Sequence, residues 1–109
     1  METVRLPNVT KTSDPYCIVA PRQLITATRG EFRREALELI DRAVLGRAES
    51  VAVDLSLTTE IDASGLGMLI LLQKRAREQG LTTRLLNAGS QVLRLLTLTK
   101  LDYLFVLMS

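Results

Sequence analysis

Short apolar runs separated by polar turns predict the strands of this chain. Four of these runs are interpreted as strands, and they cover Val4–Val9, Tyr16–Ala20, Val51–Leu55 and Leu81–Leu86. A turn-rich segment, residues 10–15, joins the first two runs, so we expect the chain to open with a β-hairpin. The segment Tyr103–Met108 is apolar enough for a last strand or for a short packed tail, and both interpretations stay open.

Longer segments with apolar stripes predict three helices. The first covers Gly30–Leu45, and its stripe follows the helical period through Phe32, Ala36, Leu39, Ile40 and Ala43. The second runs from about Ser64 to Gln79, where Gly80 ends it. The third begins at Ser90, its expected N-cap, and runs to about Thr97 with the apolar residues Val92, Leu93, Leu95 and Leu96. Ahead of the first helix, Leu24–Arg29 is interpreted as a linker in which Thr28 is a candidate cap.

The order of these elements predicts the fold class. Strands alternate with helices after the opening hairpin, and this alternation is typical of an α/β protein with a mixed sheet and crossover helices. The chain has 109 residues, no repeat and no linker that would divide it, so residues 1–109 are expected to form a single domain.

The start of the second helix is the most informative part of the sequence. Asp62 and Ser64 are both favourable N-cap residues, so one of them is expected to cap this helix. A hydroxyl there lies beside unpaired backbone N–H groups and the positive end of the helix dipole, where a phosphate would be well held. The next two turns are apolar nearly all round. We expect one face to pack on the sheet, formed by Leu66, Leu69, Ile70, Gln73 and Ala76, and another to point elsewhere, formed by Met68, Leu71, Leu72 and Arg75. Met68 and Leu72 fit either the core or a protein interface.

Composition excludes several classes of function. The 14 basic and 12 acidic residues give a net charge of only +2, which is no electrostatic case for binding nucleic acid. Without histidine and with a single cysteine, the chain has no His-dependent catalytic site and no Cys/His metal site. The pair Gly65 and Gly67 lacks the third glycine of a dinucleotide-binding loop, so close packing and a tight helix start are its expected role. We therefore expect a binding protein without a cofactor rather than an enzyme.

The hydropathy of the chain bears on its location. No signal peptide is visible, because the first residues lack an apolar central region. The apolar run Met68–Leu72 is far too short to cross a bilayer. The lone Cys17 falls in an apolar run and is interpreted as a reduced core thiol. These features predict a cytoplasmic protein with no insertion into a membrane.

Residues 51–72, VAVDLSLTTEIDASGLGMLILL, closely resemble the signature of STAS domains, above all the stand-alone anti-sigma factor antagonists. The matching residues are Asp54, Leu55, Asp62, Ser64, Gly65, Leu66 and Gly67. Farther along, Ser90–Leu96 followed by Leu101 resembles a second helix of that family. The resemblance implies a STAS-like single domain with a four- to five-stranded sheet. It also implies a bacterial transcription regulator that binds a serine kinase doubling as an anti-sigma factor and so releases a sigma factor, with ATP held by the kinase.

Two departures from the family pattern concern phosphorylation. The family's phosphoacceptor serine directly follows the central aspartate, but here that position is Ala63, and the hydroxyl comes one residue later, at Ser64. A shift of one residue at a helix start turns a side chain by about 100°. An acid that the family carries near the phosphoserine is replaced by Ile25. Both changes argue against routine phosphorylation, so Ser64 is either a phosphoacceptor candidate or an N-cap or loop hydrogen-bonding residue.

The resemblance also implies where a partner binds. The residues expected to contact it are Thr58, Thr59, Asp62, Ala63, Ser64, Gly65, Leu66, Met68 and Leu72. The alternative function is a constitutive, unphosphorylated STAS accessory subunit of a lipid-transport ABC complex, or a signalling scaffold. The family often has one more helix after the final strand, whereas this sequence stops at Ser109, so a partner is a candidate source of that helix. Homodimerisation is left open.

Overall fold

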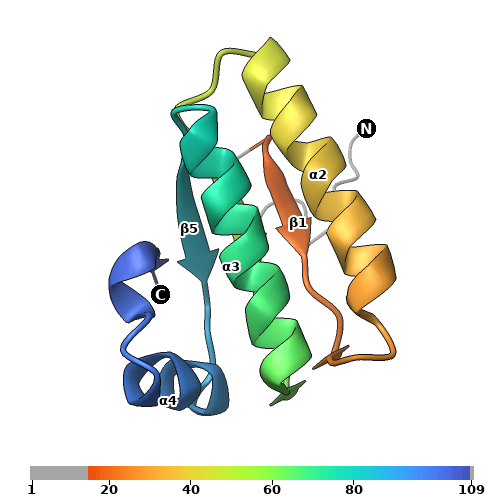
Figure 1. Ribbon diagram of the computed structural model, residues 1–109, viewed down its shortest axis with the longest axis vertical. Helices are drawn as coiled ribbons and strands as arrows, with labels where there is room; N and C mark the ends of the chain where they lie inside the picture. Colours follow the sequence, from red (N-terminus) through yellow and green to blue (C-terminus); the bar gives the residue numbers. More distant parts are fainter. Residues whose placement is uncertain (1–14, 109) are drawn as a thin grey trace, which may run out of the picture.

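The computed structural model describes residues 15–108, which fold as strands alternating with helices (Figure 1). In chain order the elements are β1 (Cys17–Val19), β2 (Gln23–Leu24), α2 (Arg29–Leu45), β3 (Ser50–Asp54), β4 (Glu60–Ile61), α3 (Ala63–Glu78), β5 (Thr82–Leu86), α4 (Ser90–Leu98), a 3-10 helix η1 (Asp102–Leu104) and β6 (Val106–Met108). The predicted strand Val4–Val9 lies outside the described residues. So does the hairpin that it would form.

Four strands form the main sheet in the order β1-β3-β5-β6, and every pair in it is parallel. Each strand therefore lies beside the previous strand of this sheet, and a helical segment connects them, as parallel pairing requires. β2 and β4 form a separate two-stranded parallel sheet. The predicted α/β fold with crossover helices is confirmed. The antiparallel pairing that would make the sheet mixed belongs to the predicted hairpin and is outside residues 15–108.

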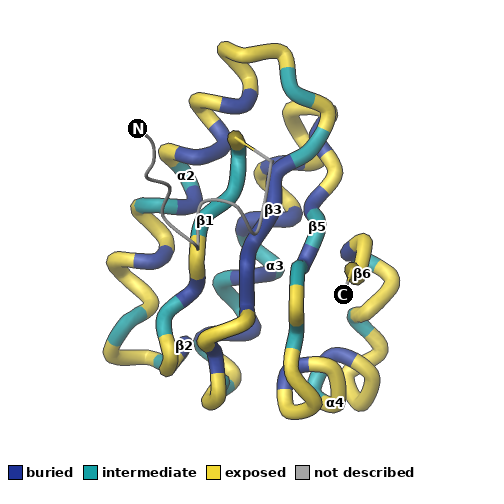
Figure 2. The backbone as a smooth tube through the Cα atoms, turned by 180° about the vertical axis from the view of Figure 1, so that it is seen from behind, coloured by how far each residue is buried: buried dark blue, intermediate teal, exposed yellow. Residues whose placement is uncertain are grey.

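Helices α2 and α3 lie side by side over one face of the main sheet (Figure 1). Seen from behind, β1, β3 and β5 are in front of α3, and β3 is buried along most of its length (Figure 2). Val51 and Val53 of β3 belong to the hydrophobic core, together with the buried stripes of both helices. A strand between two others and under helices is expected to be continuously apolar, as residues 51–53 in the middle of β3 are.

The first helix agrees with its prediction almost residue for residue. The buried residues of α2 are Phe32, Ala36, Leu39, Ile40 and Ala43, which are the members of the predicted stripe. Thr28 takes the N-cap position but makes no side-chain capping bond. Its hydroxyl instead donates to the carbonyl of Gln23, at 2.7 Å. The linker prediction for residues 24–29 is wrong at both ends, because Leu24 is buried and belongs to β2, and Arg29 is the first residue of α2.

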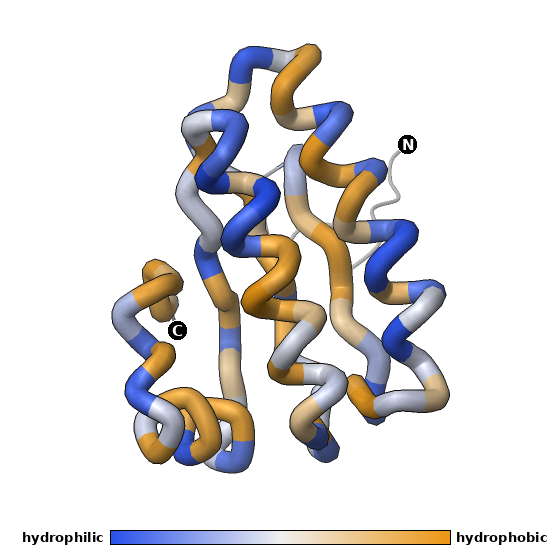
Figure 3. Tube along the Cα trace, in the orientation of Figure 1, coloured by the Kyte–Doolittle hydropathy of each residue, from blue (hydrophilic) through white to orange (hydrophobic). Residues whose placement is uncertain are grey.

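The second helix is correct in extent and partly wrong in orientation. Four of the five residues predicted to face the sheet are buried, namely Leu66, Leu69, Gln73 and Ala76. Ile70, the fifth, is only half-buried, and Leu72 is 1% exposed instead. The middle of α3 is orange in Figure 3, and residues 68–72 are consecutive apolar residues, so hydropathy alone does not fix which of them turns inward.

The last third of the chain is the least buried. Ser90 is the first residue of α4 rather than its cap; the N-cap is Gly89, with no side-chain capping bond. Only Val92 and Leu96 of this helix are buried, and Leu93 is exposed. The segment predicted as a strand or a packed tail contains most of η1 and the exposed strand β6. Among residues 15–108, no helix combines the length and hydropathy needed to span a bilayer.

Candidate functional site

The start of α3 lies where the main sheet meets the small β2–β4 sheet. The chain leaves β3 at its carboxyl end, passes through the loop 55–59 and enters β4, which leads directly into α3. Two loop residues tie this segment to the chain after β1: the Thr58 hydroxyl donates to the Pro21 carbonyl at 2.8 Å, and the Thr59 N–H donates to the Arg22 carbonyl at 2.9 Å. The helix start is thus held by a part of the chain that is distant in sequence.

Asp62 caps α3 and anchors the surrounding contacts. Its Oδ1 accepts the N–H of Gly65 at 2.9 Å, which confirms that one of the two predicted cap residues has this role. Its Oδ2 accepts the N–H of Thr26 at 3.2 Å and the Thr26 hydroxyl at 3.4 Å. These bonds favour the charged carboxylate. The pKa of Asp62 is therefore below its ordinary value, chiefly because of the Gly65 N–H and then because of Thr26.

Ser64 makes a side-chain contact of a different kind. Its Oγ lies 2.8 Å from the Oγ1 of Thr26, within hydrogen-bonding distance. Ser64 is half-buried and is not the capping residue, whereas Ala63, at the position where the family has its phosphoacceptor, is exposed. The exposed position of this turn thus has no hydroxyl, and the hydroxyl that is present is already engaged with Thr26.

Gly65 allows the two segments to approach closely. A Cβ added at Gly65 would lie 1.9 Å from the carbonyl oxygen of Leu24 and 2.7 Å from its carbonyl carbon. Both are backbone atoms of the strand β2, so they cannot rotate away as the end of a side chain could. A Cβ added at Gly67 would meet nothing within 4 Å. The predicted close-packing role is therefore confirmed for Gly65 and wrong for Gly67.

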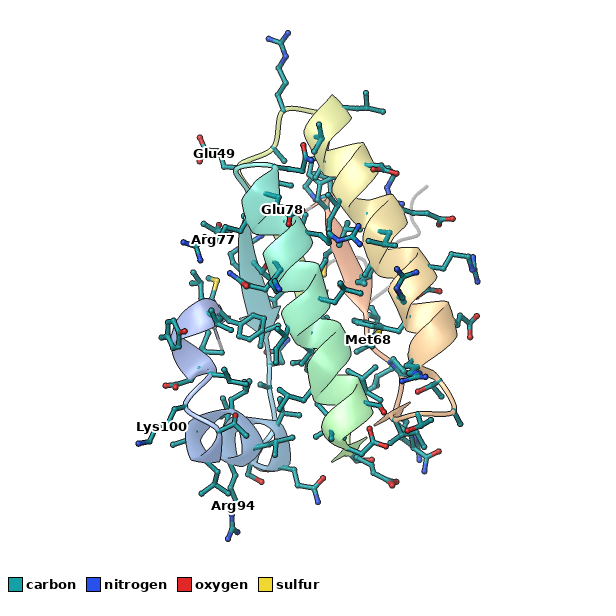
Figure 4. All side chains as sticks on the ribbon, in the orientation of Figure 1. Glu49, Met68, Arg77, Glu78, Arg94 and Lys100 are labelled. Atoms are coloured by element: carbon teal, nitrogen blue, oxygen red, sulfur yellow. The ribbon has the colours of Figure 1, made fainter. Side chains whose placement is uncertain are left out.

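The predicted contact residues differ in how much of them reaches the surface. Ala63 and Thr59 are exposed; Asp62, Ser64 and Met68 are half-buried; and Thr58, Gly65, Leu66 and Leu72 are buried. Figure 4 places Met68 on the side of α3 that faces α2, where it packs against the core. Of the two interpretations left open for Leu72, the structure supports the core, because at 1% exposure the side chain has no surface to offer a partner.

Two residues near the start of α3 were missed in the sequence analysis. Thr26 lies in the segment interpreted as a linker, and no pattern relates it to Asp62 or Ser64, 36 and 38 residues away. Leu57 is 58% exposed in the loop before β4. A leucine next to a predicted strand is ordinarily assigned to the core, so only the structure reveals this one as a surface residue. A side-chain hydrogen bond from Gln23 Nε2 to Glu60 Oε1, at 2.8 Å, also joins β2 to β4.

Other parts of the described chain hold less chemistry. Within residues 15–108, no group of three or more Cys, Asp or Glu side chains is placed to hold a metal ion. Burial raises the pKa of the half-buried Cys17 thiol. A surface groove of about 640 Å³ lies between the carboxyl-terminal halves of α2 and α3, with Val44, Arg75 and Glu78 among its lining residues. It is at the opposite end of these helices from Asp62.

Comparisons with known structures show the fold. A candidate anti-sigma factor antagonist from Thermotoga maritima matches with a TM-score of 0.71 and 20% sequence identity, over 88% of this chain and 81% of that one. The anti-sigma factor antagonist SpoIIAA in its unphosphorylated form matches with a TM-score of 0.58 and 18% identity, over 85% of this chain and 76% of that one. No curated protein sequence gives a significant match.

The sequence itself matches a family model described as "Mlab, STAS domain" over residues 23–108. The match includes β2, the loop 55–59, the whole of α3 and every later element. It therefore includes Thr26, Asp62 and Ser64, the three side chains that meet at the start of α3. Since the matched region is most of the 109 residues, the chain belongs to the STAS domain family.

Proposed function

We propose that this chain is an anti-sigma factor antagonist that binds its anti-sigma factor with the start of α3. STAS domains are binding modules rather than enzymes, so assigning a function to this chain means identifying the protein that it binds. The observation that carries the proposal is that the start of α3 is both exposed and firmly held. Ala63 is open to solvent, while its neighbours Asp62 and Gly65 are fixed by contacts to residues 24 and 26. A surface held in one arrangement loses little conformational freedom on binding.

Leu57 supplies the apolar contact that such a surface needs. It is 58% exposed, in the loop directly before β4, with Thr59 exposed beside it. A single exposed leucine is ordinary on a protein surface, so this proposal assigns Leu57 to the binding surface by its place in the loop directly before β4 and α3 rather than by its exposure alone. The partner in this proposal is a serine kinase that doubles as the anti-sigma factor, and the complex forms in the cytoplasm.

Ser64 is the residue at which this binding would be switched. A phosphate adds roughly two negative charges. Thr26 Oγ1 lies 2.8 Å from Ser64 Oγ and 3.4 Å from the Asp62 carboxylate, so those charges would be added close to an existing one. The kinase, which holds ATP, would transfer the phosphoryl group, and the complex would dissociate because the added negative charges would be buried in the interface without a compensating partner.

A second candidate function has its own supporting observation. The exposed Ala63 has no hydroxyl, and the Ser64 hydroxyl is half-buried and engaged with Thr26. A kinase would have to break that contact to reach its acceptor. This favours a constitutive, unphosphorylated subunit, such as the STAS accessory subunit of a lipid-transport ABC complex or a signalling scaffold. The same surface would then bind a transporter ATPase or a scaffold protein.

The test is to isolate the partner and measure its affinity for variants. A tagged chain is used to capture proteins from a lysate of the source organism, and mass spectrometry identifies them along with any phosphate on Ser64. Recovery of an ATP-binding serine kinase supports the antagonist. Recovery of a transporter ATPase in its place, with Ser64 always unmodified, overturns it in favour of the constitutive subunit.

Two matched leucines locate the binding surface on the captured partner. Leu57→Ala is expected to weaken binding about tenfold or more. A side chain buried near the centre of an interface typically contributes more than about 1 kcal/mol to the free energy of binding. Leu45→Ala is the control: Leu45 is 84% exposed at the far end of α2, and its loss should leave the affinity unchanged. Equal effects of the two substitutions would place the interface elsewhere.

A further inference from the structure

A second surface groove, of about 430 Å³, lies between α3, the start of β5 and the segment that contains η1. It is lined by Gln73 and Arg77 of α3, by residues 81–83, and by residues 103–106, and it is named the η1 groove. Figure 4 shows Arg77 on the side of α3 away from α2. Both α3 residues belong to the second half of this helix, so the η1 groove is separate from the helix start at Asp62. Its volume is typical of a small-molecule site.

The hydroxyl of Thr83 is buried beside this groove without a partner. Thr83 is 2% exposed, and its Oγ1 is the one buried side-chain oxygen or nitrogen of residues 15–108 that makes no hydrogen bond. Buried hydroxyls are nearly always hydrogen-bonded in folded proteins, because an unpaired one costs free energy. Thr83 also lines the η1 groove, so a molecule bound there can supply the missing bond.

Two more polar side chains of the η1 groove lack partners. Gln73 is only 8% exposed, yet its side-chain amide makes no hydrogen bond with residues 15–108. Within the same residues, the Arg77 guanidinium makes no ion pair. The adjacent acid, Glu78, lines the groove beside α2 instead. An amide offers both donors and an acceptor, and a guanidinium presents a planar fork that matches a carboxylate.

Apolar side chains supply the rest of the lining. From the segment 103–106, Tyr103 is 78% exposed and Val106 is 47% exposed, and Leu104 between them is half-buried. An aromatic ring and an aliphatic side chain thus offer open surface in the same groove as an unpaired cation. This combination suits a molecule that is apolar at one end and anionic at the other.

We propose that the η1 groove binds a small organic carboxylate with an apolar body. Arg77 pairs with the carboxylate, Gln73 and Thr83 hydrogen-bond to its polar end, and Tyr103 and Val106 contact the apolar body. The single cation favours a monocarboxylate over a phosphate ester, because a phosphate carries roughly two negative charges. The site is independent of the start of α3, so it goes beyond the proposed function.

Titration of the isolated protein with phenylbutyrate, followed by two-dimensional NMR of the backbone amides, tests this proposal. Phenylbutyrate is expected to shift the amides of residues 73–77, 81–83 and 103–106, with a Kd of about 1 mM or tighter. Phenylbutyramide has the same body without the charge, and acetate has the charge without the body. Both should bind about tenfold more weakly or worse, since each lacks one half of the interaction.

Three variants assign the contacts. Arg77→Gln should weaken phenylbutyrate binding about tenfold or more, because a charge-assisted bond is lost. Arg75→Gln is the matched control, since Arg75 is also exposed on α3 but lines the groove beside α2, and it should leave the affinity unchanged. Thr83→Val should weaken binding about threefold to tenfold without lowering the stability of the free protein, because it removes a hydroxyl that is buried without a partner. A purely structural role for Thr83 predicts the opposite, a loss of stability with unchanged affinity.

Four outcomes would overturn the proposal. The first is an absence of saturable shifts in the η1 groove at phenylbutyrate concentrations up to about tenfold above the expected Kd. The second is equal affinity for phenylbutyrate and phenylbutyramide, which would remove the carboxylate from the assignment. The third is an equal loss of affinity in Arg77→Gln and Arg75→Gln, which would mean general attraction to a basic surface. The fourth is a Thr83→Val variant that binds as tightly as the wild type and unfolds more easily.

Discussion

The starts of α3 and α4 look alike in the sequence and differ in the structure. Each helix follows a strand, β4 of the small sheet for α3 and β5 of the main sheet for α4, and both were predicted to have a capping side chain. At α3, Asp62 caps the helix and accepts two further bonds from Thr26. At α4, the N-cap is Gly89, and Ser90 makes no capping bond.

The two helix starts differ in what holds them in place. The entry to α3 is fixed from outside by residues of another segment, Leu24 and Thr26, so its exposed Ala63 is presented in one arrangement. The entry to α4 depends on its own backbone and on the burial of Val92 and Leu96 farther along the helix. A capping sequence alone therefore does not show whether a helix start is fixed by the rest of the chain; at α3 the contacts from a distant segment do.

Substitution of Gly65 should have the largest effect on this comparison. In Gly65→Ala the new Cβ would overlap the Leu24 backbone, so the helix start or β2 must move. Overpacking of this kind typically costs about 1–3 kcal/mol, which is a large part of the stability of a small domain. Gly67→Ala is the control, since its Cβ meets nothing and should stabilise the helix by about 1 kcal/mol or less. Denaturant unfolding of the two variants measures both effects, and equal stabilities would contradict the close contact.

Removal of the two candidate caps should have a smaller and unequal effect. Asp62→Ala deletes the acceptor of the Gly65 N–H and of both Thr26 donors, so the melting temperature should fall. Ser90→Ala removes a side chain that makes no capping bond, so the free energy of unfolding should change by about 0.5 kcal/mol or less. Thermal unfolding followed by circular dichroism checks the pair. Similar losses in both would mean that the two helix starts are equivalent after all.

The dependence on pH should be the smallest of these effects. The pKa of Asp62 is lowered in the folded state, so the carboxylate stabilises the fold above its ordinary value of 3.8 and loses this contribution as the pH falls through the folded value. Asp62→Asn should therefore be less stable than the wild type at about pH 7, and the difference should shrink below about pH 4. Denaturant midpoints across this range test the prediction. A difference that stays constant down to about pH 2 would show that the charge of Asp62 is not involved.

The parts of the fold that repeat a local period could be predicted from the sequence. The stripe of α2 agrees because five apolar residues at helical spacing fit one buried face and no other. The strand β3 agrees because a short β-branched run beside a helix suits a covered parallel strand. In α3, apolar residues on every side of the first two turns leave the orientation undetermined, and Leu72 rather than Ile70 is buried.

The contacts that define the candidate site could be predicted only in part. The cap at Asp62 and the close packing at Gly65 follow from residue type and position within a helix start. Strands β2 and β4 have two residues each, too few to show any period, and they exist because each supplies the other's partner. Thr26 reaches Asp62 only after that pairing forms. A contact of this kind, between residues far apart in the chain, cannot be predicted from local sequence patterns.

The order of strands in the main sheet has a consequence for how the chain is made. The strands lie side by side in the order in which they are synthesised, with Cys17 opposite Ala52, Ser50 opposite Thr82, and Arg84 opposite Val106. Within residues 15–108, each newly completed strand of this sheet thus finds its neighbour already present, and no later strand has to be inserted between two earlier ones. During synthesis on the ribosome, each new strand of this sheet can therefore pair with the edge strand that was made before it.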